Sequence, residues 1–321
     1  NVQKKNFDIL WLLANEGALE LCLFVMQFVE KFDSEEIENL ILYERDVFSY
    51  NFLPRAIMHI KTEKEFEIIE KILEFIKKFD FFFICLLESE GENSFLHVLA
   101  EHAINVNIFN KFWELVEKEL KPEQIREILM KKSKWGQIPL YFAIYNKSNQ
   151  EEMEKNLLEI YSKHLGDKEL FSIKSRDHEN IFKHAAYRGK KKLVELVCGK
   201  LQNFFKNDTK EFKKFLLKKY GSDKQNALQL SVSNYSSDVF HCVFEFYEKV
   251  FGETYDEILS KLIFERDENN NNLLHLACRH NSSHVVELIW GKIEKFLKND
   301  KEKLKEFLEL KGEDGKTIQE L

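Results

Sequence analysis

A motif that returns every 42 to 46 residues is the feature that most restricts how this chain can fold. The stretch "NLLHLACRHNSSHVVELI" has upstream relatives such as "NIFKHAAYRGKKKLVELV" and "SFLHVLAEHA". Aligned on one apolar position, the seven copies have their anchors at Leu10, Leu53, Leu96, Leu140, Phe182, Leu228 and Leu274. Because a regular period of this length marks stacked structural units, we predict a repeat solenoid.

Each copy carries the pattern of two packed helices. The third residue after the anchor is small in most copies, as expected where two helices approach closely: Ala56, Ala143, Ala185, Ser231 and Ala277. A second apolar segment follows, and residues 193–197 and 285–289 have the spacing of a helix with one buried face. Three prolines and eleven glycines are too few for the turns of a large sheet protein. We therefore predict an all-α fold and interpret the 29 phenylalanines as core residues.

The segment between the second helix and the next anchor predicts a further helix. "KPEQIREILMKKSKWG" and "NDTKEFKKFLLKKYGSD" begin with residues typical of helix starts, continue with apolar residues at helical spacing and end in residues that favour turns. We predict an extended second helix, an extra short helix, and then a finger-like turn that leads into the next copy.

These residues resemble the ankyrin repeat, whose pattern is Thr-Pro-Leu-His-x-Ala-Ala, a glycine and an apolar helix. The copies that carry the resemblance best keep Phe182, Ala185, Ala186 and Gly189, or Leu274, His275 and Ala277 with Asn281 at the glycine position. The period is longer than the usual length of about 33 residues, and a generic α-solenoid of HEAT-type period is the alternative. The resemblance implies one ankyrin-like α-solenoid domain over residues 1–321, with the start of an eighth copy at 313–321. We expect the chain to be a fragment of a longer protein, because this last copy is incomplete and the first residue is not Met.

The histidines of the motif do not predict chemistry. His97 and His275 stand where the ankyrin family has a structural histidine, whose ring ties one turn to the next repeat. His280 and His284 are four residues apart, but a turn separates them, and a zinc site needs at least three ligands. "HVLAEH" and "GEDGKT" fail the spacing of zinc-protease and phosphate-loop motifs. We predict no catalytic residue, no metal ligand and no cofactor, so the protein is not expected to be an enzyme.

The cysteines and the hydropathy favour a cytoplasmic location. The five cysteines are widely spaced and none forms a Cys-x-x-Cys pair, which is typical of buried thiols in a reducing compartment: Cys22, Cys85, Cys198, Cys242 and Cys278. The longest apolar run, residues 81–87, is much shorter than the roughly 20 residues that span a bilayer. We expect no transmembrane segment in this chain.

Charge is distributed unevenly along the chain. The formal net charge is −7, but residues 183–224 hold thirteen basic and four acidic side chains. This basic band includes Lys213, Lys214, Lys218 and Lys219, and it could attract an acidic protein or an anionic lipid surface. The alternative is that these lysines only keep the outer helix faces solvated. Because the whole chain is acidic, nucleic acid is the least favoured partner.

The resemblance implies a non-catalytic scaffold that binds another protein through a concave surface of fingers and first helices. The candidate partner-binding residues are the four lysines of the basic band together with Asp177, Glu179, Asp223, Lys224, Asp267, Asn269, Asn271, Arg279 and His280. The alternative is a substrate-recruiting arm of a larger enzyme, or the cytosolic repeat arm of a channel, receptor or toxin. The identity of the partner does not follow from the sequence.

Overall fold

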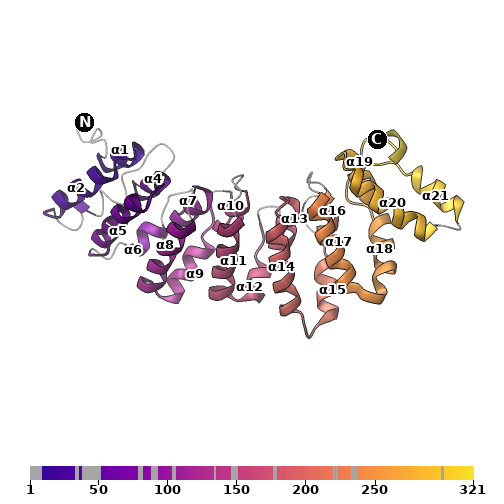
Figure 1. The fold of residues 1–321 in the computed structure, drawn as a ribbon, viewed down its shortest axis with the longest axis horizontal. Coiled ribbons are helices and arrows are strands. Elements are labelled where there is room, and N and C mark those ends of the chain that lie inside the picture. The colour runs from indigo at the N-terminus through magenta and orange to yellow at the C-terminus, as the bar shows by residue number, and fades with distance from the viewer. Residues whose placement is uncertain are drawn as a thin grey trace. The chain divides into compact units, whose positions relative to one another are not determined.

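The computed structural model describes most of the chain as helix and turn (Figure 1). The described residues are 9–32, 36–37, 52–78, 82–87, 93–102, 106–133, 135–145, 151–175, 179–219, 221, 223–232, 237–297 and 300–321. Within these ranges there is no strand, and the only β-structure consists of isolated bridges such as that between Lys311 and Thr317, so the predicted all-α class is confirmed. The chain divides into two compact units, Asn1–Gly166 and Asp167–Leu321. A single uninterrupted domain stays a prediction.

The first unit holds the helices of the first four copies, in the order short, long, short that the sequence predicts. These are α1 (Ile9–Asn15) and α2 (Leu19–Val29); α4 (Phe52–Met58), α5 (Glu63–Lys77) and α6 (Phe82–Leu87); α7 (Phe95–His102), α8 (Val106–Glu119) and α9 (Pro122–Met130); and α10 (Pro139–Tyr145) and α11 (Glu151–Leu165). The third helix expected in the first copy falls mainly outside the described residues.

The second unit begins with the third helix of the fourth copy and continues through the seventh. Its helices are α12 (Asp167–Ser172); α13 (Ile181–Tyr187), α14 (Lys191–Phe204) and α15 (Thr209–Leu217); α16 (Ala227–Val232), α17 (Ser237–Phe251) and α18 (Tyr255–Phe264); and α19 (Leu273–Arg279), α20 (Ser283–Leu297) and α21 (Lys301–Leu308). Short 3₁₀ turns occupy η2 (Gly252–Thr254) and η3 (Ile318–Glu320). The extended second helix and the extra short helix are therefore confirmed.

The core of each unit lies where the repeat pattern places it. All seven anchors are buried, and Ala56, Ala143, Ala185, Ser231 and Ala277 are buried beside them. In the second unit α16 packs between α13 and α19, while α17 packs between α14 and α20. Small side chains let the first helices approach each other closely. One row of first helices and one row of second helices therefore share a core that continues from repeat to repeat.

The turn between the first and second helix requires a left-handed residue. Gly17 and Gly189 have φ angles of 71° at this place, and Asn281 adopts φ 53° at the corresponding place of the seventh copy. The backbone N–H groups of Gly189 and Asn281 donate to the carbonyls of Ala186 and Cys278. Asparagine tolerates this conformation better than other side chains, which explains why it replaces glycine there.

A buried tyrosine on the second helix of one repeat holds the third helix of the preceding repeat. The hydroxyl of Tyr161 on α11 donates to the carbonyl of Leu129 on α9 at 2.6 Å, and the hydroxyl of Tyr247 on α17 donates to the carbonyl of Leu216 on α15 at 2.7 Å. Carbonyls at the end of a helix lack a partner inside the helix. The tyrosines satisfy them, so the third helix is part of the repeat and not a loose connection.

We expect Tyr247→Phe to lower the free energy of unfolding by about 1–2 kcal/mol, because the buried carbonyl of Leu216 loses its donor while the ring keeps its packing. Urea denaturation measures the loss, and hydrogen exchange should show faster exchange in α15 than in α14. Tyr187→Phe is the matched control, because Tyr187 is exposed. Equal stability losses in the two variants would contradict this role of Tyr247.

None of the helices in the described ranges is both long enough and apolar enough to cross a membrane.

Candidate binding groove

Hydrogen bonds hold the turn before α19 as a closed finger. The N–H of Asp267 donates to the carbonyl of Asn271 at 2.9 Å, and the Asp267 carboxylate accepts from the N–H groups of Asn269 and Asn271, each at 2.9 Å. The same turn begins at Ser175, whose N–H donates to the carbonyl of Glu179 at 2.8 Å. An acidic or hydroxyl side chain that satisfies the turn amides holds the finger in one conformation.

An asparagine ends three of these fingers and caps the helix that follows. The side-chain oxygens of Asn180, Asn226 and Asn272 accept from backbone N–H groups three residues further on, at 2.9 to 3.0 Å. Each asparagine stands two residues before the anchor of its repeat. Asparagine at this place supplies one of the acceptors that the first turn of a helix lacks.

The histidine after the anchor ties one repeat to the next, as the resemblance implies. Burial lowers the pKa of His97 to about 4, so the ring is neutral at pH 7. Its Nδ1 accepts from the Ser94 N–H at 3.1 Å, and its Nε2 donates to the carbonyl of Gln137 in the next finger at 2.8 Å. His275 Nε2 lies 3.0 Å from the Leu310 carbonyl in the same way. The predicted structural role of both histidines is confirmed.

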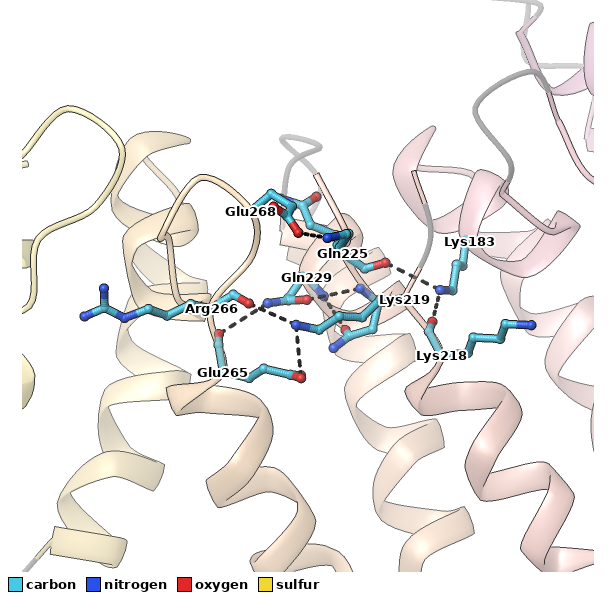
Figure 2. Close-up of polar contacts among 10 residues, drawn as sticks. Lys183, Lys218, Lys219, Gln225, Gln229, Glu265, Arg266 and Glu268 are labelled. Carbon is cyan, nitrogen blue, oxygen red and sulfur yellow. Dashed lines mark hydrogen bonds and ion pairs between the residues drawn. The ribbon is translucent and has the colours of Figure 1, made fainter. Parts of the chain in front are cut away.

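Lysine and glutamine take the place of this histidine in the fifth and sixth repeats. Figure 2 shows Lys183 directed at the backbone of the next turn, where its Nζ donates to the carbonyls of Lys218 and Gln225. Gln229 donates to the Glu265 carbonyl from the equivalent position. Sequence reasoning missed both residues. The available signal was their alignment with His97 and His275, one residue after the anchor.

Lys183 is a buried cation whose proton affinity is strongly reduced. Its side chain is 1% exposed. Burial lowers its pKa to about 7; the Glu179 carboxylate opposes this shift, and the Lys218 ammonium adds to it. The carbonyls that surround Lys183 therefore hold an ammonium group that is easily deprotonated.

A hollow of about 440 Å³ lies between the fingers and the first helices of the second unit. Apolar side chains from three first helices form part of its lining: Tyr187 on α13, Leu230 on α16 and Leu276 on α19. Seven of the sequence-predicted partner-binding residues also line it: Glu179, Asp223, Asp267, Asn269, Asn271, Arg279 and His280. The fingers thus bring together residues that are about a hundred positions apart in the sequence. We call this hollow the groove.

Three of these seven residues build the framework of the groove. Glu179 is buried and its carboxylate lies 3.0 Å from His184 Nδ1. Asp267 is buried and accepts from Gln225 Nε2 of the preceding finger at 2.7 Å. Asn271 is buried and accepts from the Glu313 N–H of the following turn at 3.2 Å. Asp267 and Asn271 hold neighbouring fingers together, whereas Glu179 is bonded within its own repeat. Contact of these three residues with a partner stays a prediction.

The other four residues are more accessible. Asp223 is exposed and Asn269 is half-buried, and both belong to fingers. Arg279 spans to the last turn, with ion pairs to Glu313 at 2.8 Å and Asp314 at 3.3 Å. Burial lowers the pKa of His280, and the neighbouring Arg279 lowers it further. These side chains can present polar groups to a partner while the framework residues keep their positions.

The lysines of the basic band do not join the groove. Lys213 donates to Thr254 Oγ1 at 3.1 Å and lies over the Phe251 ring, and Lys214 pairs with Glu211 at 3.3 Å. Lys219 pairs with Glu265 at 3.0 Å and donates to the Arg266 carbonyl at 2.9 Å (Figure 2). Much of the predicted band is therefore already matched by groups of the same unit.

The remaining predicted residues have separate environments. Lys224 forms an ion pair with Glu268 of the next finger. Lys218 is exposed and gives its carbonyl to Lys183. Asp177 lies outside the described residues. Contact of these residues with a partner stays a prediction.

The histidines near the groove do not gather a metal site. His284 Nε2 lies 2.7 Å from His241 Nε2 on α17, and His280 ends α19 on the other side of a turn. Across the described ranges, no group of three or more His, Cys, Asp or Glu side chains has the arrangement that a metal ion needs.

The pair of packed helices recurs through the described repeats, and a side chain one residue after the anchor bonds to the next turn in four of them: His97, Lys183, Gln229 and His275. These repeats are ankyrin-like. No protein-family model matches the chain, and no curated protein is similar to it. Solved structures similar to it include the ankyrin repeat domain of Bcl-3, a member of the IkappaB family, with a TM-score of 0.49 and 11% identity over 84% of this chain and 92% of that chain.

A second similar chain comes from the solved complex of the predatory endopeptidase Bd0816 from Bdellovibrio bacteriovorus with immunity protein Bd3460. Its TM-score is 0.40 with 15% identity, over 70% of this chain and 87% of that chain. Both scores are low, so the description of the fold rests on the repeat geometry itself.

Proposed function

We propose that the protein is a non-catalytic scaffold and that its groove binds a segment of another protein. The observation that carries the proposal is the assembly of four successive turns and three first helices around one hollow with apolar and polar lining. Interfaces between proteins commonly combine an apolar centre with a polar rim. Because hydrogen bonds already fix the fingers, a partner would order little of this surface on binding.

The groove is a better candidate surface than the basic band. Lys213, Lys214 and Lys219 already have acceptors or acidic partners in their own unit, which reduces what an acidic protein or an anionic membrane would gain. The groove offers Asp223 and Asn269 at its edge instead. All five cysteines are thiols rather than disulfides, which agrees with the cytoplasmic location that we propose for this interaction.

A photo-crosslinking residue at position 269 tests the groove in the cells that express the protein. We expect a partner to be crosslinked from Asn269 and to be lost when Asp223→Lys is added, because this change reverses a charge at the edge of the groove. Mass spectrometry identifies the crosslinked protein, and circular dichroism checks that both variants remain folded.

The matched position is Lys214, which is exposed on α15 and does not line the groove. Crosslinks from residue 214 that disappear with Lys213→Glu would move the binding surface to the basic band. Crosslinks from neither position would overturn the scaffold proposal.

A further inference from the structure

The lining of the groove carries more negative than positive side chains. Its acidic and basic residues are Glu179, Asp223, Asp267, Glu313 and Arg279. Four carboxylates and one guanidinium give this lining a formal net charge of −3. His280 also lines the groove, but burial and the neighbouring Arg279 lower its pKa, so its ring adds little positive charge at pH 7. The groove is therefore an acidic surface.

Neighbouring basic residues do not cancel this negative excess. The other charged side chains of the described finger residues balance one another in number: Lys224, Lys316, Glu268 and Asp314. The Nζ of Lys183 donates to the carbonyls of Lys218 and Gln225, and Lys183 does not line the groove. The guanidinium of Arg279 is held between Glu313 at 2.8 Å and Asp314 at 3.3 Å. The one cation of the lining therefore already has two acidic partners.

The carboxylate of Asp267 places a negative charge in the wall of the groove. This carboxylate accepts from the N–H groups of Asn269 and Asn271 and from Nε2 of Gln225, all of which are neutral donors. Neutral donors stabilise a carboxylate without cancelling its charge. Because Asp267 is buried, little solvent screens this charge, and a cleft with walls of low dielectric concentrates the field of the charges that line it. A cationic side chain in the groove would be attracted.

The same lining contains an accessible aromatic ring. Tyr187 on α13 is 42% exposed. A guanidinium group stacks on an aromatic face and also donates several hydrogen bonds to carboxylate and amide oxygens. The ammonium group of lysine has the same charge, but it is compact and more strongly hydrated. The combination of carboxylates and an aromatic ring therefore favours arginine over lysine.

We propose that the segment held in the groove is basic and that its arginine side chains contact the Tyr187 ring and the carboxylates of the lining; this step rests on the proposed function. Leu230 and Leu276 line the groove between the fingers and can contact apolar side chains of the same segment. An acidic segment would be repelled by the net charge of the lining.

A fluorescein-labelled peptide that repeats Arg-Ser-Leu tests this specificity on the full chain. Two matched peptides carry lysine or glutamate in place of arginine. Measured by fluorescence anisotropy, the arginine peptide should bind most tightly, the lysine peptide about two- to fivefold more weakly, and the glutamate peptide not detectably. The affinity for the arginine peptide should fall as sodium chloride is added, because salt screens the attraction between exposed charges.

Three substitutions locate the binding. Asp223→Asn should weaken the arginine peptide by about two- to fivefold, as expected for a charge at the edge of an interface. Tyr187→Leu should reduce the affinity for the arginine peptide to that for the lysine peptide. Glu302→Gln is the matched control, because it removes the same charge from an exposed position on α21 that does not line the groove. It should leave the affinity unchanged.

Binding of the glutamate peptide as tightly as the arginine peptide, binding of none of the three peptides, or equal weakening by Asp223→Asn and Glu302→Gln would each contradict a basic partner segment. The crosslink from residue 269 tests the proposed function separately. A crosslinked segment without arginine would overturn only the basic specificity, whereas the absence of crosslinks concerns the scaffold itself.

Discussion

Between pH 7 and about pH 9.5, the free energy of unfolding should rise by about 3 kcal/mol in the unchanged protein and by much less in Lys183→Gln. The pKa of Lys183 is about 7 in the folded chain and 10.5 in its ordinary state. Between these values the unfolded chain carries a proton that the folded chain does not, so stability increases with pH. Below pH 7 the buried ammonium is charged in both states and its full desolvation cost is present.

Glutamine is the informative replacement because Gln229 occupies the equivalent position one repeat later. It keeps an N–H donor for the carbonyls of the next turn and removes the titration. Chemical denaturation at several pH values measures the difference between the two proteins. Lys214→Gln is the control, since Lys214 is exposed. A pH slope that survives Lys183→Gln would contradict the assignment to Lys183.

Phe212→Ala should lower the free energy of unfolding by roughly 3–5 kcal/mol. Phe212 on α15 is 6% exposed and stacks on Phe205, with ring centroids 5.0 Å apart and an interplanar angle of 11°. It also meets the edge of Phe246 on α17 at 5.8 Å. Phe246 in turn contacts Phe182, the anchor of the fifth repeat. Removal of one ring leaves a cavity where the third helix, the second helix of the next repeat and an anchor meet.

Urea denaturation of the full chain measures this loss. Phe204→Ala provides the comparison, because Phe204 contacts Phe171 and Phe205 but is 39% exposed. We expect that substitution to lower the free energy of unfolding by no more than about 1.5 kcal/mol, since less surface is withdrawn from water. If both variants lose a similar free energy of unfolding, the aromatic contacts of Phe212 do not stabilise the protein more than those of Phe204.

The sequence alone determined the repeat and the parts of the fold that follow from local periodicity. Three kinds of position align from copy to copy in the sequence. They are the anchors, the small residues three positions later, and the glycine or asparagine at the turn between the first and second helix. The same register aligned His97 with His275, and the resemblance to ankyrin repeats implied that both link to the next repeat. These features repeat because each copy packs against its neighbours in the same way. A regular spacing of residue types in the sequence therefore indicates a regular stack of structural units.

Only the tertiary structure decided which polar side chains hold the repeats together. Lys183 and Gln229 donate to backbone carbonyls of the next turn, as the histidine does in other repeats. Residue type does not predict this role, because any donor of suitable length can reach those carbonyls. Glu179, Asp267 and Asn271 look like exposed finger residues in the sequence, but all three are buried. Glu179 bonds to His184 in its own repeat, and Asp267 and Asn271 bond to neighbouring turns. Such contacts between repeats depend on the relative rotation of the packed helices, which no local pattern encodes.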